Sequence, residues 1–345
     1  MFKVKVENRK QLEIVIASKN VSEIILSRDS FAEKDLPKLV NQIKESGKLA
    51  WILMERISRY EENMKFGIKP NLKVEPHDST DLRLSTDKIF EIKNLDGIII
   101  QNLDSFAYML RKINKVANEK LKVELNYTMN CYNNMTKNVF ENMYNIKRKN
   151  AKTVPLLFTA PVELNIYELS VVGYDTMILY SYIDTMVSAN CLKKNLNLGT
   201  GYIIGKKGTL FKNVKNQDNT TKNSICKNRF NFNKVEDFSS YIIDRKGKKL
   251  HYKTYCKYCY NKIFNTEPLY LLDKIDELGS ALINFNKSVD KKYIEKDNSD
   301  LTSGINSKSS FRIDFSFENE KEVNNILNGI CPDSFTRGHI KNSIK

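Results

Sequence analysis

The sequence predicts an α/β fold: a (β/α)8 TIM-like barrel with a large insertion between its seventh and eighth strands. Short β-rich runs alternate with helical stretches from residue 2 to residue 182, as in βαβ units around a parallel sheet. The alternation stops near Asp184 and returns at Phe311, which gives eight units, the number that closes a barrel. We therefore divide the chain into barrel units 1 to 7 (1–183), a cysteine-containing insertion (184–309), and the last barrel unit with the C-terminal tail (310–345).

Each element is predicted from its own pattern. Strands are expected where β-branched, aromatic and other apolar residues run together, at 2–6, 23–27, 49–54, 97–101, 121–127, 154–158, 177–182 and 311–316. Helices are expected where apolar residues recur at helical spacing, at 9–18, 33–45, 57–64, 103–116, 135–144, 166–171 and 318–327. A polar stretch with two prolines, 69–85, is expected to loop over the surface. Within the insertion we expect only short β runs, at 241–245 and 250–253.

Composition and charge narrow the class of protein. Hydrophobic residues make up 41% of the chain, enough for a sizeable core, so global disorder is excluded. The net charge of +15 favours anionic partners, with RNA as the main possibility. The alternative is a lysine-filled surface in a chain rich in Lys, Asn and Ile. No apolar run is long enough to span a membrane and the N-terminus lacks a signal-peptide layout, so we expect a cytoplasmic protein without membrane contact.

A Cys-x-x-Cys pair, Cys256 and Cys259, is the sharpest chemical motif. This spacing lets two thiolates bind one metal from a tight turn, and thiolates select zinc or iron–sulfur centres. Cys191 and Cys226 are the available partners in the insertion, and His251 is a further ligand if the metal is zinc. The alternative is that these are small buried residues at a chance spacing.

Polar side chains near the predicted strand ends are the other candidates. Glu163 and Asp314, which belong to the sixth and eighth units, are predicted catalytic carboxylates, the alternative being a helix cap or an ion pair with lysine. Arg28 and Arg56 follow the second and third strands, where a guanidinium can bind a substrate carboxylate or phosphate; an exposed surface arginine is the alternative.

The C-terminal run Phe335-Thr336-Arg337-Gly338-His339 adds two candidates. Arg337 is predicted to bind substrate, and His339 to act in catalysis, although a lone histidine is more often structural. No Ser-His-Asp pattern, phosphate-binding glycine loop or HExxH helix is recognisable.

Four stretches together resemble the collagenase-like peptidase family. They are Met186–Lys194 around Cys191, the Asp244-Arg245-Lys246-Gly247 turn, Cys256–Asn265, and Phe311–Glu318 followed by the terminal F-T-R-G-H. Their order agrees with the family, and the resemblance spans nearly the whole chain, closest to the C-terminal barrel of long two-barrel members. We expect the first barrel to be absent or supplied by a partner subunit.

The resemblance implies more than one activity. The family is named for peptidase (hydrolase) activity, whereas other members resemble iron–sulfur proteins that hydroxylate RNA bases, drawing on prephenate, or a quinone precursor without oxygen. It implies a 4Fe-4S cluster held by cysteines, with zinc as the alternative. We favour RNA hydroxylation, with peptide or protein hydrolysis as one alternative and a non-catalytic barrel that binds RNA or a partner as another.

The chain departs from the family pattern near Cys191. Residues 195–199 lack the family's next cysteine, so we expect Cys226 to be the fourth ligand beside Cys191, Cys256 and Cys259. Residues 172–175 are less apolar than in the family.

Overall fold

The computed structural model describes residues 1–57, 87–116, 118–149, 154–189, 202–204, 210–212, 237–258, 260–278 and 310–340. The strands of its main sheet are β1 (Phe2–Val6), β2 (Val21–Ser27), β3 (Leu49–Leu53), β4 (Gly97–Ile100), β5 (Lys122–Leu125), β6 (Leu156–Phe158), β7 (Thr176–Ser181), β14 (Leu269–Tyr270) and β15 (Ser310–Asp314). The α-helices are α1 (Arg9–Ala17), α2 (Leu36–Glu45), α4 (Leu103–Lys112), α5 (Asn134–Lys147), α6 (Ile166–Val172) and α9 (Glu320–Leu327).

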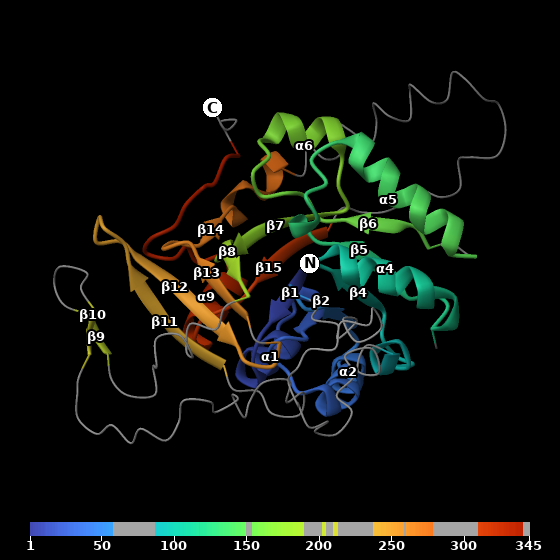
Figure 1. Cartoon of the computed structure of the whole chain (residues 1–345), viewed down its shortest axis with the longest axis horizontal. Helices are drawn as coiled ribbons and strands as arrows, with labels where there is room; N and C mark the ends of the chain where they lie inside the picture. Colours follow the sequence, from blue (N-terminus) through green and yellow to red (C-terminus); the bar gives the residue numbers. More distant parts are fainter. Residues whose placement is uncertain are drawn as a thin grey trace, which may run out of the picture.

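The main sheet is curled and mostly parallel, with helices on its outer side (Figure 1). Its strand order is β14-β7-β15-β1-β2-β3-β4-β5-β6, and only β14 pairs antiparallel. A single parallel bridge between Thr159 and Thr176 joins the end of β6 to β7. The α/β class and the parallel order agree with the prediction, whereas the complete eight-stranded barrel stays a prediction.

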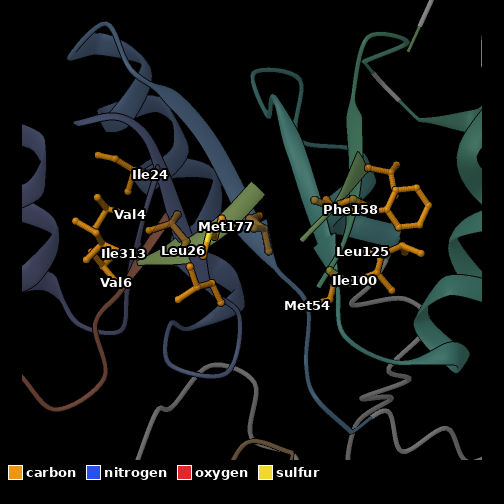
Figure 2. Close-up of a cluster of buried hydrophobic side chains, with 14 of the residues drawn as sticks. Val4, Val6, Ile24, Leu26, Met54, Ile100, Leu125, Phe158, Met177 and Ile313 are labelled. Carbon is orange, nitrogen blue, oxygen red and sulfur yellow. The ribbon is translucent and has the colours of Figure 1, made fainter. Parts of the chain in front are cut away.

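The outer face of the sheet forms the hydrophobic core. Val4 and Val6 of β1, with Ile24 and Leu26 of β2, belong to one buried cluster, and Ile313 of β15 lies beside them (Figure 2). Helix residues of the same cluster include Leu12, Val15, Leu39, Val40, Phe106, Met109 and Phe140. Because side chains alternate along a strand, the residues between these apolar positions point to the inner face.

The inner face is charged, although it is buried. Lys3 of β1 pairs with Glu124 of β5, with 2.5 Å between Nζ and Oε2, and its ammonium lies 3.2 Å from the centroid of a Trp51 ring. Both Lys3 and Glu124 are at most 2% exposed. Gly97 of β4 leaves room for that indole, because a Cβ there would lie 2.3 Å from the Trp51 ring. The inner face is therefore held by ion pairs and by a small apolar cluster of Ile25, Trp51, Leu53 and Ile99.

Asparagine begins most of the helices. An N-cap side chain accepts a backbone N–H of the first turn, which satisfies a donor that has no partner within the helix. The N-cap asparagines are Asn8 (α1), Asn102 (α4), Asn133 (α5), Asn165 (α6) and Asn319 (α9).

All eight predicted barrel strands are present, with ends shifted by at most two residues. The predicted helices 9–18, 103–116, 135–144, 166–171 and 318–327 correspond to α1, α4, α5, α6 and α9, of which α5 and α6 extend beyond the predicted ends. Residues 33–45 contain a short 3-10 helix, Glu33–Asp35, followed by α2. The helix at 57–64 and the loop at 69–85 lie almost wholly outside the described residues. None of the described helices is long and apolar enough to cross a membrane.

The two short β runs expected within the insertion, at 241–245 and 250–253, overlap strands of the structure, and further strands accompany them. The strands β8 (Asp184–Ser188), β11 (Asp237–Ile243), β12 (Lys249–Tyr255) and β13 (Tyr260–Phe264) form a four-stranded antiparallel sheet in the order β11-β12-β13-β8. A separate hairpin pairs β9 (Tyr202–Ile204) with β10 (Leu210–Lys212). Lysine, tyrosine and asparagine are frequent in β12 and β13, so the hydrophobic signal of these two strands is weak.

Candidate functional site

The candidate site lies at the edge of the curled sheet where the parallel strands end. Glu7 follows β1, Asp29 follows β2, Glu55 follows β3 and Asp184 follows β7, so four carboxylates come to the same edge. In α/β folds this edge carries the reactive groups. The hairpin formed by β12 and β13, which Figure 1 shows beside β15, contacts these residues with alternating lysines and tyrosines.

Glu7 is the most completely paired of the four. Its carboxylate accepts hydrogen bonds from Lys5 (2.9 Å), Lys253, Tyr255 (3.2 Å) and Ser30 (3.3 Å). Burial alone would raise the pKa of the Glu7 carboxyl, but the ammonium groups of Lys253 and Lys5 hold that pKa well below its usual range. Glu7 thus remains a carboxylate and ties the hairpin to β1.

Asp29 is buried as deeply, but among the described residues only one of its two carboxylate oxygens has a hydrogen-bond partner. It is 1% exposed, and Oδ2 accepts the hydroxyl of Tyr260. Its Oδ1 is buried and has no hydrogen-bond partner among the described residues. Burial raises the pKa of the Asp29 carboxyl to about 6, although the ammonium of Lys262 opposes the shift. A carboxyl that titrates near neutral pH can both give and take a proton.

Tyr260 and Lys262 of β13 flank Asp29 in different ways. Burial and the Asp29 carboxylate hold the pKa of the Tyr260 hydroxyl far above its ordinary value, so this group remains a donor. The Lys262 ammonium is 3.8 Å from Asp184, too long for a hydrogen bond. Asp184 accepts the hydroxyl of Tyr127 instead. The buried Lys262 ammonium, ion-paired with Asp184, therefore also lies within electrostatic reach of Asp29.

The turn between β12 and β13 carries Cys256, which is buried. Lys257 fixes this turn, because its ammonium donates to the carbonyl of Arg28 (2.6 Å) and lies 2.8 Å from Glu33 Oε1. Tyr258 donates to the same Glu33 oxygen at 3.0 Å. The turn that carries Cys256 and Lys257 is consequently bound to Arg28, the residue directly before Asp29.

The two predicted arginines at this edge are engaged by the protein. Arg28 is fully buried, and its guanidinium donates to Glu33 (2.9 Å) and Glu55 (2.8 Å). Arg56 is half-buried and donates from Nη1 to the carbonyl of Gln101 at 2.9 Å, while its buried Nε has no partner among the described residues. Of the two, Arg56 retains a donor for a ligand in this arrangement.

Asp314 lies on the inner face of the sheet. Arg312, two residues earlier in β15, holds it with two hydrogen bonds, Nε to Oδ1 at 2.6 Å and Nη2 to Oδ2 at 2.8 Å. The third guanidinium nitrogen of Arg312 donates to Asn126 at 3.0 Å. Asp314 therefore contributes to the buried ion pairs beneath the site.

Glu163, Arg337 and His339 are the remaining predicted residues. Glu163 follows β6 and has one buried oxygen, Oε2, without a partner among the described residues. Arg337 pairs with Asp273 and donates to the carbonyl of Tyr270 at 2.8 Å, and His339 is exposed. Within the described chain, no hydrogen bond or ion pair joins Glu163, Asp314 and His339 to one another.

The predicted metal ligands fall mostly outside the described residues. Cys256 is described, whereas Cys191, Cys226 and Cys259 are not. Among the described residues, no group of three or more His, Cys, Asp or Glu side chains could hold a metal ion.

Several residues of the site were missed by the sequence reading: Glu7, Asp29, Lys253, Tyr260 and Lys262. A signal was present at Asp29, which follows a predicted strand and stands next to Arg28. The lysines of β12 and β13 gave no signal, because a lysine-rich chain makes each of them look like a surface residue.

No family model, curated protein or solved structure gives a significant match to this chain.

Proposed function

We propose that the chain is an enzyme whose active site is the strand-end edge beneath the β12–β13 hairpin, in a (β/α)8 barrel that closes between β6 and β7. The buried, half-paired Asp29 carboxyl carries this proposal. A buried carboxylate oxygen without a hydrogen-bond partner does not stabilise a fold. Titratable groups with strongly shifted pKa values concentrate at functional sites. Asp29 would hold or release a proton at Oδ1.

The cofactor that we propose is a 4Fe-4S cluster bound by Cys191, Cys226, Cys256 and Cys259. In support, Cys256 is a buried thiol in a turn that Lys257 fixes to the strand-end edge. When bound, such a cluster supplies single electrons. The chain's own residues position the turn over the edge and keep Asp29 enclosed.

The reaction that we propose is modification of RNA of the oxygen-independent hydroxylation type. The net charge of +15 supports an anionic substrate, and Arg56 Nε is a buried donor at the same edge without a partner among the described residues. Arg56 would orient the substrate, and Asp29 would exchange a proton with it.

Metal analysis of anaerobically purified protein tests the cofactor. We expect brown protein with about four irons per chain, and loss of iron in Cys256→Ser and in Cys226→Ser. The matched control is Cys331→Ser, because this cysteine is exposed and outside the proposed set. A colourless zinc protein, or full iron retention in Cys256→Ser, would overturn the iron–sulfur proposal.

The reaction is tested on RNA by mass spectrometry. Supplied with RNA and with prephenate, the co-reactant on which the resembled RNA hydroxylases draw, the wild-type protein should add one oxygen to a base, whereas Asp29→Asn should bind RNA with unchanged salt dependence but form product at least about 100-fold more slowly. Hydrolysis of peptides that survives metal removal would instead support the peptidase alternative. Salt-sensitive RNA binding without any product would support the non-catalytic alternative.

A further inference from the structure

Four aromatic rings lie in a row that crosses from the β11–β12 hairpin to the ends of β7 and β15. The ring centroid of His251 is 5.1 Å from that of Phe317 and 5.5 Å from that of Tyr182, and Tyr241 of β11 pairs directly opposite His251. Tyr241 is 44% exposed and the other three side chains are half-buried. Exposed ring surface does not contribute to a core, and a planar ligand can stack on it.

The turn of the same hairpin is strongly basic. Arg245, Lys246 and Lys248 are exposed in this basic turn, and Lys249 follows at the start of β12. Asp244 shapes the turn, because its Oδ1 accepts the backbone N–H groups of Lys246 and Lys248, each at 2.8 Å. The hairpin extends away from the main sheet (Figure 1). Backbone groups thus hold the turn, and its basic side chains face solvent.

The charge along the aromatic row is uneven. At one end, the Lys249 ammonium lies 4.9 Å from the centroid of the Tyr241 ring. At the other end, three acidic side chains act electrostatically on Tyr182: Glu318, Glu322 and Glu267. A polyanion is therefore attracted to the end of the row that adjoins the basic turn and repelled from the Tyr182 end.

We propose that the aromatic row and the basic turn bind single-stranded RNA. This inference rests on the proposed RNA substrate and adds the surface that holds it. Bases stack on Tyr241 and His251, and phosphates contact the basic turn. Stacking on aromatic side chains beside basic residues is the common way to bind a single strand, because every base has a π-face. An anionic membrane or an acidic peptide would use the charges but not the rings.

The surface is placed to bring a nucleotide to Asp29. Because side chains alternate along a strand, His251 lies on the same face of β12 as Tyr255, which pairs opposite Tyr260, the residue that donates to Asp29. His251 and Tyr255 are separated by roughly 13 Å along the extended strand. This length corresponds to about four stacked nucleotides at roughly 3.4 Å each, so one RNA strand can reach both places.

Binding of a labelled single-stranded RNA of roughly 12 nucleotides to the anaerobically purified full chain tests this surface. Fluorescence anisotropy at several salt concentrations gives the affinity. Tyr241→Leu keeps an apolar side chain but removes the π-face, so binding should weaken between about 5-fold and 150-fold, whereas Tyr241→Phe should bind like wild type. An abasic strand of equal length should bind wild type more weakly than RNA, and Tyr241→Leu should not change its affinity.

The basic turn is tested by its salt dependence. Replacing both Lys246 and Lys248 by alanine should reduce the slope of log K against log salt by about 1.4, since each phosphate contact of a single strand contributes about 0.7. The matched controls are Tyr167→Leu on α6 and Lys120→Ala before β5, because both side chains are exposed and lie on other elements. Both controls should keep the wild-type affinity and slope, and all variants should keep the wild-type circular dichroism.

The outcomes separate this surface from the proposed substrate. Unchanged RNA affinity in Tyr241→Leu, or equally tight binding of the abasic strand or of polyglutamate, would overturn the stacking surface while wild-type RNA binding still supports the substrate. A wild-type protein that binds no single-stranded RNA at about 100 μM would overturn both.

Discussion

Glu7 and Asp29 follow neighbouring parallel strands, and both are almost completely buried. Their hydrogen bonding differs, and the pKa values of their carboxyl groups shift in opposite directions. Around Glu7, two lysines and two hydroxyl groups satisfy both oxygens, and the pKa of its carboxyl falls. Around Asp29, one tyrosine satisfies one oxygen, and the pKa rises to about 6. Burial is common to both, so the difference comes from how close the lysines lie.

The comparison separates structure from function at one edge of the sheet. A saturated carboxylate such as Glu7 fastens the β12–β13 hairpin to the barrel and stabilises the fold. A carboxylate kept half-paired destabilises the fold at neutral pH, which is expected at sites that trade stability for activity. Three substitutions test this distinction.

Glu7→Gln should have the largest effect. Without the carboxylate, the buried ammonium groups of Lys5 and Lys253 lose the counter-charge that they share, and removing one partner of such a pair typically costs about 3–5 kcal/mol. Urea unfolding at pH 7.5 measures the loss, with the exposed Glu13→Gln on α1 as control. A loss below about 1 kcal/mol would show that Glu7 does not fasten the hairpin.

Asp29→Asn should stabilise the protein, the opposite sign to Glu7→Gln. The Asp29 carboxyl has a pKa of about 6 in the fold against an ordinary value of 3.8, so the wild type loses stability as pH rises through this range. Above pH 6 the variant should be more stable by roughly 2–3 kcal/mol, and the difference should shrink toward zero near pH 4. Urea unfolding at several pH values measures it. A difference that does not depend on pH would contradict the assignment.

Lys262→Met should have the smallest effect. The Lys262 ammonium opposes the rise in the pKa of Asp29, so its removal should move the titration of Asp29 further above pH 6, by about 1 pH unit or less. The midpoint of the pH-dependent stability difference reports this change. Lys246→Met, on an exposed turn, should leave the midpoint in place, and a midpoint that falls in Lys262→Met would contradict the electrostatic account.

The strands were predictable because their signal is local. Runs such as the apolar stretch of β4 and the alternation in β1 specify a strand within a few residues, and Asn8 and Asn319 mark helix starts in the same way. The site could not be predicted in this way. Tyr260 and Asp29 are 231 positions apart, and the inner-face pair Lys3 and Glu124 is 121 positions apart.

The charged residues of the inner face were the least predictable. In a chain with 56 lysines and arginines, the expectation for any one lysine is a solvated surface position, yet Lys3 and Lys5 are buried in β1. Their alternation with Val4 and Val6 indicates a two-faced strand, but the sequence alone assigns the lysine face to solvent. Only the pairing of distant strands brings Glu124 to Lys3, whereas Glu7 is just two residues from Lys5 along the chain.

A direct titration of the Asp29 carboxyl tests the central claim most closely. Infrared difference spectra between wild type and Asp29→Asn isolate the carboxylic-acid band of this one group as pH is varied. The half-paired arrangement predicts that the band disappears with a midpoint near pH 6. A midpoint at or below the ordinary value of 3.8 would contradict it, because Asp29 would then be a fully stabilised carboxylate like Glu7.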